Sequence, residues 1–307
     1  MRSTTLMLLV LVLGPGCSDL LGFETPHVVV DADPDTAALP HCDYATPFDA
    51  PIKVPGLSLP NTDERTARLL PDELTAFFNG GAVSSQLFVA TRPSVTDPFG
   101  TPTELASLNT AQTFDPSPSR DGLTLYYSAD TGGGIQRLFV ARRTTLTDSF
   151  TQGGQLTNVS PSMSSEGDGQ PYLPGDTPND ELWFTSNRAG GLGGSDIWRA
   201  TFDGTTFVNP VLVPELSSSY TDWLPVLSRD KLTVYFSTDR PTSLGDLDIW
   251  TSHRDQATDP FPPPHPVDEV NSADGERSTW LSDDDCRLYL FRVDPSGRDV
   301  YVAVRRP

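Results

Sequence analysis

The chain has 307 residues, a formal net charge of −20, 29 prolines and 24 glycines. The negative charge argues against binding to nucleic acid or to an anionic membrane surface, because both require a cationic face. Proline and glycine in these numbers disfavour a helical protein and fit many short strands joined by turns. We therefore expect an all-β protein, long enough to form one large domain.

The N-terminus has the features of an export signal. Arg2 precedes an apolar run at residues 6–13, which is too short to span a bilayer and typical of a signal peptide. The following Gly14-Pro15-Gly16-Cys17 resembles the lipobox of bacterial lipoproteins, although its leucine stands one position early. We predict that residues 1–16 are a signal peptide and that Cys17 is lipidated. Cleavage and secretion without a lipid is the alternative.

Residues 17–47 show little hydrophobic periodicity and contain several aspartates and prolines. We interpret this segment as the lipid-attachment cysteine followed by a flexible tether. This organisation predicts an exported protein of the bacterial cell envelope that faces the periplasm or the cell surface. The membrane is then contacted only through the lipid anchor.

Residues 48–307 contain five sequence repeats. Each repeat has an aromatic-rich strand, such as LTLYYS (residues 123–128) or LTVYFS (residues 232–237), followed by a second strand with an aromatic anchor. The anchors are separated by 51, 59, 52 and 51 positions, and they are Phe88, Phe139, Trp198, Trp250 and Tyr301. Turn sequences such as Ser119-Arg120-Asp121-Gly122 precede the first strand of most pairs and predict tight hairpins.

A further strand is expected after Phe48, Phe99, Phe150, Phe207 and Phe261. Because the first of these outer strands has no blade before it and the last blade has none after it, the two ends complete each other. We predict a five-bladed β-propeller of four-stranded antiparallel blades, in which residues 52–57 pair beside residues 300–304 and close the ring. The alternative is a six-bladed ring with one degenerate blade, but residues 18–47 are too few and too polar to form it.

The motifs SNRAGGLGGSDIW (residues 186–198) and STDRPTSLGDLDIW (residues 237–250) resemble the WD40-like repeats of TolB-type periplasmic propellers. Repeat one departs from the pattern, with Gln86 at the position of the aspartate that precedes the anchor. The resemblance implies a propeller scaffold of the cell envelope that binds other proteins. It implies no particular ligand, because one fold serves many functions.

One set of equivalent positions, at the start of the innermost strands, is acidic in four of five repeats: Glu64, Thr113, Asp168, Asp222 and Glu276. A ring of carboxylates around a channel repels itself and needs compensation. Ion pairs with arginines, among them Arg188, Arg240 and Arg292, are the interpretation we favour. A bound Ca²⁺ is the alternative, because this ion takes carboxylate and carbonyl oxygens. We therefore expect no cofactor and no metal centre.

Catalytic motifs are scarce. The four histidines, at positions 27, 41, 253 and 265, have no nucleophile at a recognisable spacing, and the sequence lacks a GxSxG motif. The leading hypothesis is a monomeric, non-catalytic scaffold that presents one face to an envelope protein or a surface polymer. The second hypothesis is a glycan-active enzyme that uses carboxylates of the channel.

Three cysteines occur, at positions 17, 42 and 286. If Cys17 carries a lipid, an even pair remains in an oxidising compartment, where such pairs commonly form a bridge. Cys286 lies in the turn between the first two strands of blade five, and Cys42 precedes the outer strand assigned to the same blade. We predict a Cys42–Cys286 disulfide, with two free thiols as the alternative.

Overall fold

β-Strands are the only regular elements among the residues that the computed structural model describes, which are 41–58, 62–81, 84–161, 167–174, 181–295 and 297–306. These residues belong to one compact unit, residues 39–307. The predicted signal peptide, Cys17 and the tether up to residue 40 lie outside them. Within the described ranges, no helix has the length and apolarity needed to cross a membrane.

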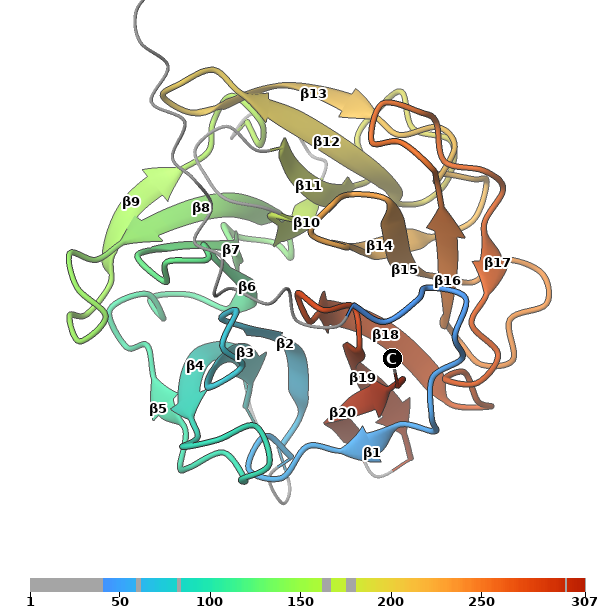
Figure 1. Cartoon of the computed structure of the whole chain (residues 1–307). Coiled ribbons are helices and arrows are strands. Elements are labelled where there is room, and N and C mark those ends of the chain that lie inside the picture. Colours follow the sequence, from blue (N-terminus) through green and yellow to red (C-terminus); the bar gives the residue numbers. More distant parts are fainter. Residues whose placement is uncertain are drawn as a thin grey trace, which may run out of the picture. The chain divides into compact units, whose positions relative to one another are not determined.

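Twenty strands form five four-stranded antiparallel sheets, arranged around one axis as in Figure 1. Blade 1 contains β2 (Glu64–Leu69), β3 (Thr75–Gly80), β4 (Gln86–Thr91) and β5 (Thr103–Glu104). Blade 2 contains β6 (Thr113–Pro118), β7 (Thr124–Asp130), β8 (Gln136–Arg142) and β9 (Thr151–Gln155). Blade 3 contains β10 (Asp168–Tyr172), β11 (Glu181–Ser186), β12 (Asp196–Phe202) and β13 (Phe207–Leu212).

Blade 4 contains β14 (Asp222–Leu227), β15 (Thr233–Thr238), β16 (Asp248–His253) and β17 (His265–Pro266). Blade 5 contains β18 (Gly275–Leu281), β19 (Arg287–Asp294), β20 (Gly297–Val304) and, as its outer strand, β1 (Ile52–Lys53) from the other end of the chain. The innermost strands contact one another in sequence around the axis, and β18 contacts β2. The predicted five-bladed propeller is confirmed, and the six-bladed alternative is wrong.

The ring closes where the sequence predicts. Ile52 pairs with Val302 and Lys53 with Tyr301, and the backbone N–H of Val54 donates to the carbonyl of Val300 at 2.9 Å. This pairing covers the edge of β20, which would otherwise present unpaired backbone groups to solvent. It also joins the two ends of the domain, so the closure depends on contacts that are very distant in the sequence.

The core lies between the blades, because the middle strands are buried on both faces and place alternate side chains against each neighbouring sheet. The five phenylalanines at or before the start of the outer strands (Phe207 is the first residue of β13) are all buried, with exposed fractions between 1% and 5%. In four blades an arginine at or just after the end of the third strand covers this ring. These arginines are Arg92 on Phe99, Arg143 on Phe150, Arg254 on Phe261 and Arg305 on Phe48.

The same four arginines also hold the first hairpin of their blade. The Nε of Arg143 donates to the carbonyl of Gly122 at 2.8 Å, and the Nε of Arg305 donates to that of Asp285 at 2.7 Å. Arg92 and Arg254 make the equivalent bonds to the carbonyls of residues 73 and 231. A charged donor and a cation–π contact from one side chain thus fix the turn between the first and second strands. These turns lie together on one face of the propeller, called the turn face below.

Candidate functional site

The predicted acidic positions do occupy equivalent places at the start of the innermost strands. Four of them open β2, β6, β10 and β14, and Glu276 is the second residue of β18. All five side chains are buried, with at most 1% exposed. Whether they bind a ligand remains a prediction, but their buried contacts within the protein restrict access to them.

Arginines compensate three of the acids, as the sequence indicates. The guanidinium of Arg188 pairs with Asp168, that of Arg240 with Asp222 at 2.9 Å, and Arg292 donates to Glu276 at 2.6 Å. Burial raises the pKa of Asp222 and of Glu276 despite these pairs. The carboxylates therefore act inside their own blades as buried ion-pair partners.

Each of these three arginines also joins its blade to the preceding one. Arg188 donates to the carbonyl of Val159 at 2.8 Å, and Arg240 donates to that of Leu216 at 2.9 Å. Their guanidinium groups lie over the aromatic anchors Trp198 and Trp250. Arg292 differs in register, since it lies within β19 directly opposite Glu276. At the equivalent positions of blades 1 and 2, Thr62 donates to Glu64, and Thr113 donates to Asn109 at 2.7 Å.

The axis of the propeller carries a second set of polar contacts that the sequence did not reveal. Each innermost strand has a β-bulge, and Thr66, Asp115 and Gln170 have positive φ angles there. Asp115 accepts hydrogen bonds from Thr66 at 2.8 Å and from Gln170 at 3.1 Å. The bulges thereby aim side chains of blades 1, 2 and 3 at one another across the axis.

Arg68 fills the axis beside this cluster. Its side chain extends from blade 1 to the carbonyl of Thr279 in blade 5, at 3.0 Å, and to that of Pro171 in blade 3. Its guanidinium lies over the ring of Tyr172, and only 1% of the residue is exposed. Burial lowers the pKa of Arg68 to about 10. A buried cation thus occupies the axis between blades 1, 3 and 5, and a smaller open pocket of about 170 Å³, lined by Asp168 and Gln170 among others, remains beside the cluster.

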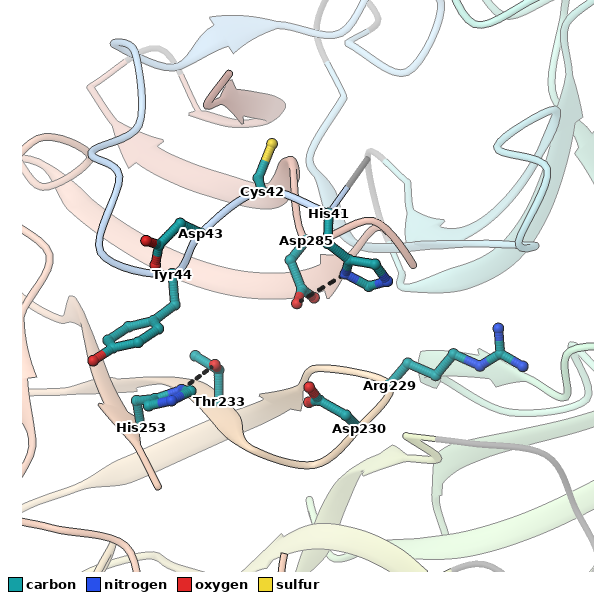
Figure 2. Close-up of a pocket in the computed structure, with 9 residues that line it drawn as sticks. All are labelled: His41, Cys42, Asp43, Tyr44, Arg229, Asp230, Thr233, His253 and Asp285. Carbon is teal, nitrogen blue, oxygen red and sulfur yellow. Dashed lines mark hydrogen bonds and ion pairs between the residues drawn. The ribbon is translucent and has the colours of Figure 1, made fainter. Parts of the chain in front are cut away.

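An open pocket of about 520 Å³ lies on the turn face, between blades 4 and 5 (Figure 2). Its floor comes from β15, β16 and the turns that contain Asp230 and Asp285, and its roof is the segment 41–44. The residues that line it are His41, Cys42, Asp43, Tyr44, Arg229, Asp230, Thr233, His253 and Asp285. Except for Cys42, none of them was among the site residues predicted from the sequence.

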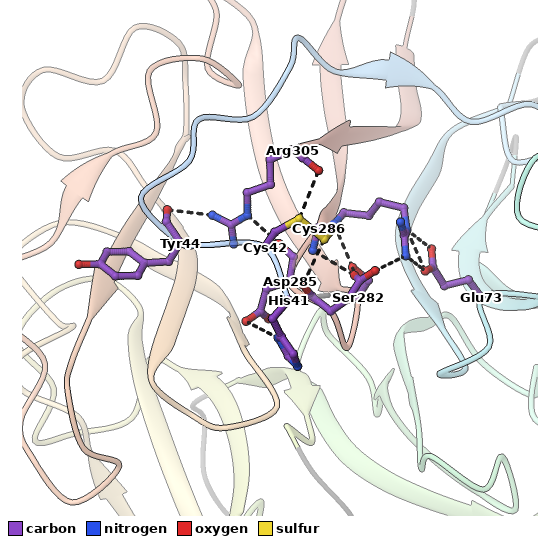
Figure 3. The surroundings of a disulfide bond; sticks show 10 residues. His41, Cys42, Tyr44, Glu73, Ser282, Asp285, Cys286 and Arg305 are labelled. Atoms are coloured by element: carbon purple, nitrogen blue, oxygen red, sulfur yellow. Dashed lines mark hydrogen bonds and ion pairs between the residues drawn. A yellow bond between two sulfur atoms is a disulfide. The ribbon is translucent and has the colours of Figure 1, made fainter. Parts of the chain in front are cut away.

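A disulfide holds the roof of this pocket. Cys42 and Cys286 are bonded, which confirms the predicted bridge (Figure 3). The backbone N–H of Cys42 donates to the carbonyl of Asp284 at 2.8 Å, and Arg305 donates to that of Tyr44 at 2.8 Å. Residues 41–47, which we expected at the end of the tether, therefore contact blade 5, and Tyr44 also contacts blade 4.

The pocket combines carboxylates with an aromatic platform. The rings of Tyr44 and His253 stack at 3.6 Å, and Thr233 lies 2.9 Å from the Nδ1 of His253. Across the pocket, Oδ2 of Asp285 lies 3.7 Å from the Nδ1 of His41. Burial, reinforced by the nearby charge of Asp230, raises the pKa of Asp285 to about 6. A carboxyl group with this pKa can hold or release a proton near neutral pH.

Metal binding finds no further support in the geometry. The described residues contain no group of three or more His, Cys, Asp or Glu side chains that could hold a metal ion. Two aspartates that precede the anchors, Asp196 and Asp248, instead accept backbone N–H bonds within their own loops. Calcium remains an untested alternative for the acidic positions.

Comparisons with known proteins agree with the architecture. No family model matches this sequence, and no curated protein does. Among solved structures, an α-L-arabinofuranosidase from Lactobacillus brevis has 11% identity over 82% of this chain and 94% of its own, with a TM-score of 0.56. A glycosyl hydrolase from Bacteroides ovatus has 14% identity over 87% of this chain and 93% of its own, with a TM-score of 0.52.

TolB proteins are also among the structural neighbours. TolB from Acinetobacter baumannii has 16% identity over 80% of this chain, with a TM-score of 0.43, and the chain spans 55% of that protein. What these likenesses share is the fold. At sequence identities this low, structural similarity shows the fold and leaves the activity open. The TM-score of the TolB match is too low to support any argument.

Proposed function

We propose that this chain is an exported, lipid-anchored and non-catalytic scaffold of the bacterial cell envelope that binds a partner through its turn face. The observation that carries the proposal is that side chains of the protein itself contact the polar groups around the propeller axis. Its acidic positions are buried, three of them are paired with arginines, and Arg68 crosses the space between blades 1, 3 and 5. The open pocket beside the disulfide is the binding site that we assign to this function.

Site-specific photocrosslinking tests this proposal in cells. A photoreactive residue in place of Tyr44, which is 49% exposed, reports on the pocket. The same residue in place of Leu244, which is 62% exposed in the loop between β15 and β16, reports on the opposite face. We expect a discrete protein or polymer adduct from position 44 and none from position 244. The reverse pattern, or no adduct from either, contradicts the proposal.

The anchor has a separate test, because Cys17 lies outside the described residues. Cells fed an alkyne fatty acid should label the wild-type protein, and Cys17→Ser should remove both the label and the retention in the membrane fraction. Secretion of unlabelled wild-type protein would favour the alternative of simple cleavage.

A glycan-active enzyme is the second candidate, and one observation favours it. Asp285, with its raised pKa, and Asp230 share the pocket, and an acid of this kind next to a second carboxylate is the pair that glycoside hydrolysis uses. The reactive carboxylates would then belong to the turn face and not to the channel. Release of reducing sugar from plant or bacterial polysaccharides, lost in both Asp285→Asn and Asp230→Asn, would establish this function over the scaffold.

A further inference from the structure

We propose that the pocket beside the Cys42–Cys286 disulfide binds a lysine or arginine side chain of a partner protein. This inference rests on the proposed scaffold function and names the chemistry of its site. The pocket has a volume of about 520 Å³ and is formed by two blades and the N-terminal segment, so it can admit a side chain together with part of its backbone.

The charge of the pocket favours a cation. Asp43, Asp230 and Asp285 all line it. The Oδ1 atom of Asp285 is buried and has no hydrogen-bond donor among the described residues, while its Oδ2 faces His41. Because Oδ1 is closed off from solvent, a ligand would reach this carboxylate through Oδ2, whose distance of 3.7 Å from His41 is longer than a hydrogen bond. An ammonium or guanidinium group would supply a charged donor there.

The two basic groups closest to the pocket have other partners. Arg229 lies at the rim, with its guanidinium directed away from Tyr44 and His253 (Figure 2), and pairs with Asp283 at 4.0 Å. Arg305 donates to the backbone carbonyls of Asp285 and Tyr44. Among the described residues, the carboxylate of Asp285 therefore has one basic side chain in ion-pair range, His41 at 3.7 Å, while the charge of Arg305 acts on it from farther away.

The aromatic platform adds a second attraction for a cation. Tyr44 stacks on His253 through one face and is 49% exposed, so its other parts are accessible to a ligand. A lysine or arginine side chain can place its alkyl stem along such a ring and its charge near the carboxylates. A neutral donor such as a hydroxyl or amide group would bond to Asp285 more weakly than a cation and would lack the attraction to the ring.

The occupant must come from another molecule. Residues 1–40, which precede the roof segment in the sequence, contain Arg2 as their only lysine or arginine. The whole chain carries a net charge of −20, so a basic partner is attracted at long range as well. A partner protein with an exposed lysine or arginine satisfies both conditions.

Titration of the isotope-labelled protein with short peptides at physiological salt tests the inference, because salt screens the general attraction to an acidic protein. The probes are Ac-Gly-Gly-Lys-Gly-Gly-NH₂, its arginine counterpart and the same peptide with acetyl-lysine. We expect NMR shifts at Tyr44 and His253 with the two cationic peptides only. Asp285→Asn should weaken their binding at least tenfold.

Two variants control this experiment. Asp285 has a φ of 59°, a conformation that asparagine also tolerates, so the substitution preserves the turn. Asp255→Asn makes the same change of charge at an exposed position outside the pocket and should leave binding unchanged. Cys42→Ser with Cys286→Ser loosens the roof, although Arg305 still holds Tyr44, and should weaken binding.

The outcomes separate this inference from the function on which it rests. Equal binding of the acetyl-lysine peptide, or equal loss in Asp255→Asn and Asp285→Asn, would overturn the cation site. Absence of peptide binding together with a specific adduct from position 44 would overturn it too, while the scaffold function stands. Glycan hydrolysis that depends on Asp230 would instead overturn the scaffold function.

Discussion

Removal of the Cys42–Cys286 disulfide should lower the stability of the propeller strongly, because the bridge closes a very long loop. Its cysteines are 244 positions apart. The loop-entropy relation gives a loss of roughly 5 kcal/mol for a loop of this length. At roughly 2–4 °C per kcal/mol for a large domain, Cys42→Ser with Cys286→Ser should lower the Tm by roughly 10–20 °C.

The double variant should still fold, because other contacts hold the joint. The pairing of β1 with β20 and the bond from Arg305 to Tyr44 do not require the disulfide. Thermal melting by differential scanning fluorimetry measures the effect. A reductant should lower the Tm of the wild type to that of the variant and leave the variant unchanged. A variant that melts within about 3 °C of the wild type would refute the reasoning that the bridge constrains the unfolded chain.

Three further predictions concern charge. Arg240→Ala should destabilise the protein by about 3–5 kcal/mol at pH 7, because Asp222 is left buried without its partner. Chemical denaturation should show a smaller loss of stability at pH 4.5, and an equal loss at both pH values would contradict the ion pair as the cause. Asp285 binds its proton more tightly in the folded state, so its own contribution to the pH profile is a slope in which stability falls by about 2–3 kcal/mol as the pH rises from about 4 to about 6. Asp285→Asn should remove this slope. If the variant and the wild type show the same dependence of Tm on pH, the slope does not come from Asp285. Millimolar calcium should leave the Tm unchanged because arginines already compensate the acids, whereas an increase that a chelator reverses, and that Asp168→Asn with Asp222→Asn abolishes, would show a bound ion.

The repeat architecture is predictable from this sequence because its signals are local. Strand alternation, acidic hairpin turns and an aromatic anchor recur about every fifty residues, and each follows from the chemistry of a few neighbouring side chains. The closure between residues 52–57 and 300–304 is also predictable from counting strands. The last blade lacks an outer strand, and the N-terminus of the domain supplies an outer strand that no blade precedes. The disulfide follows from the same topology.

The arginines show where local patterns stop being informative. Arg188 and Arg240 could be assigned to their acids because their repeats align. The arginines near the end of the third strand also recur in the sequence, at Arg92, Arg143, Arg254 and Arg305, and this signal could have been found. Arg68 could not, since it is unique to blade 1 and its partners belong to blades 3 and 5.

The sequence alone determined the five blades, their closure and the bridge, because each depends on periodicity or on counting strands. Tertiary structure alone decided where a ligand has access. It buried the acidic positions within their blades and filled the axis with Arg68. It also joined residues 41–44 to turns that lie near positions 230 and 285, which creates the open pocket. The bridge predicted from strand counting brings residue 42 to residue 286, but no pattern in the sequence records that Tyr44 then reaches His253 in the neighbouring blade.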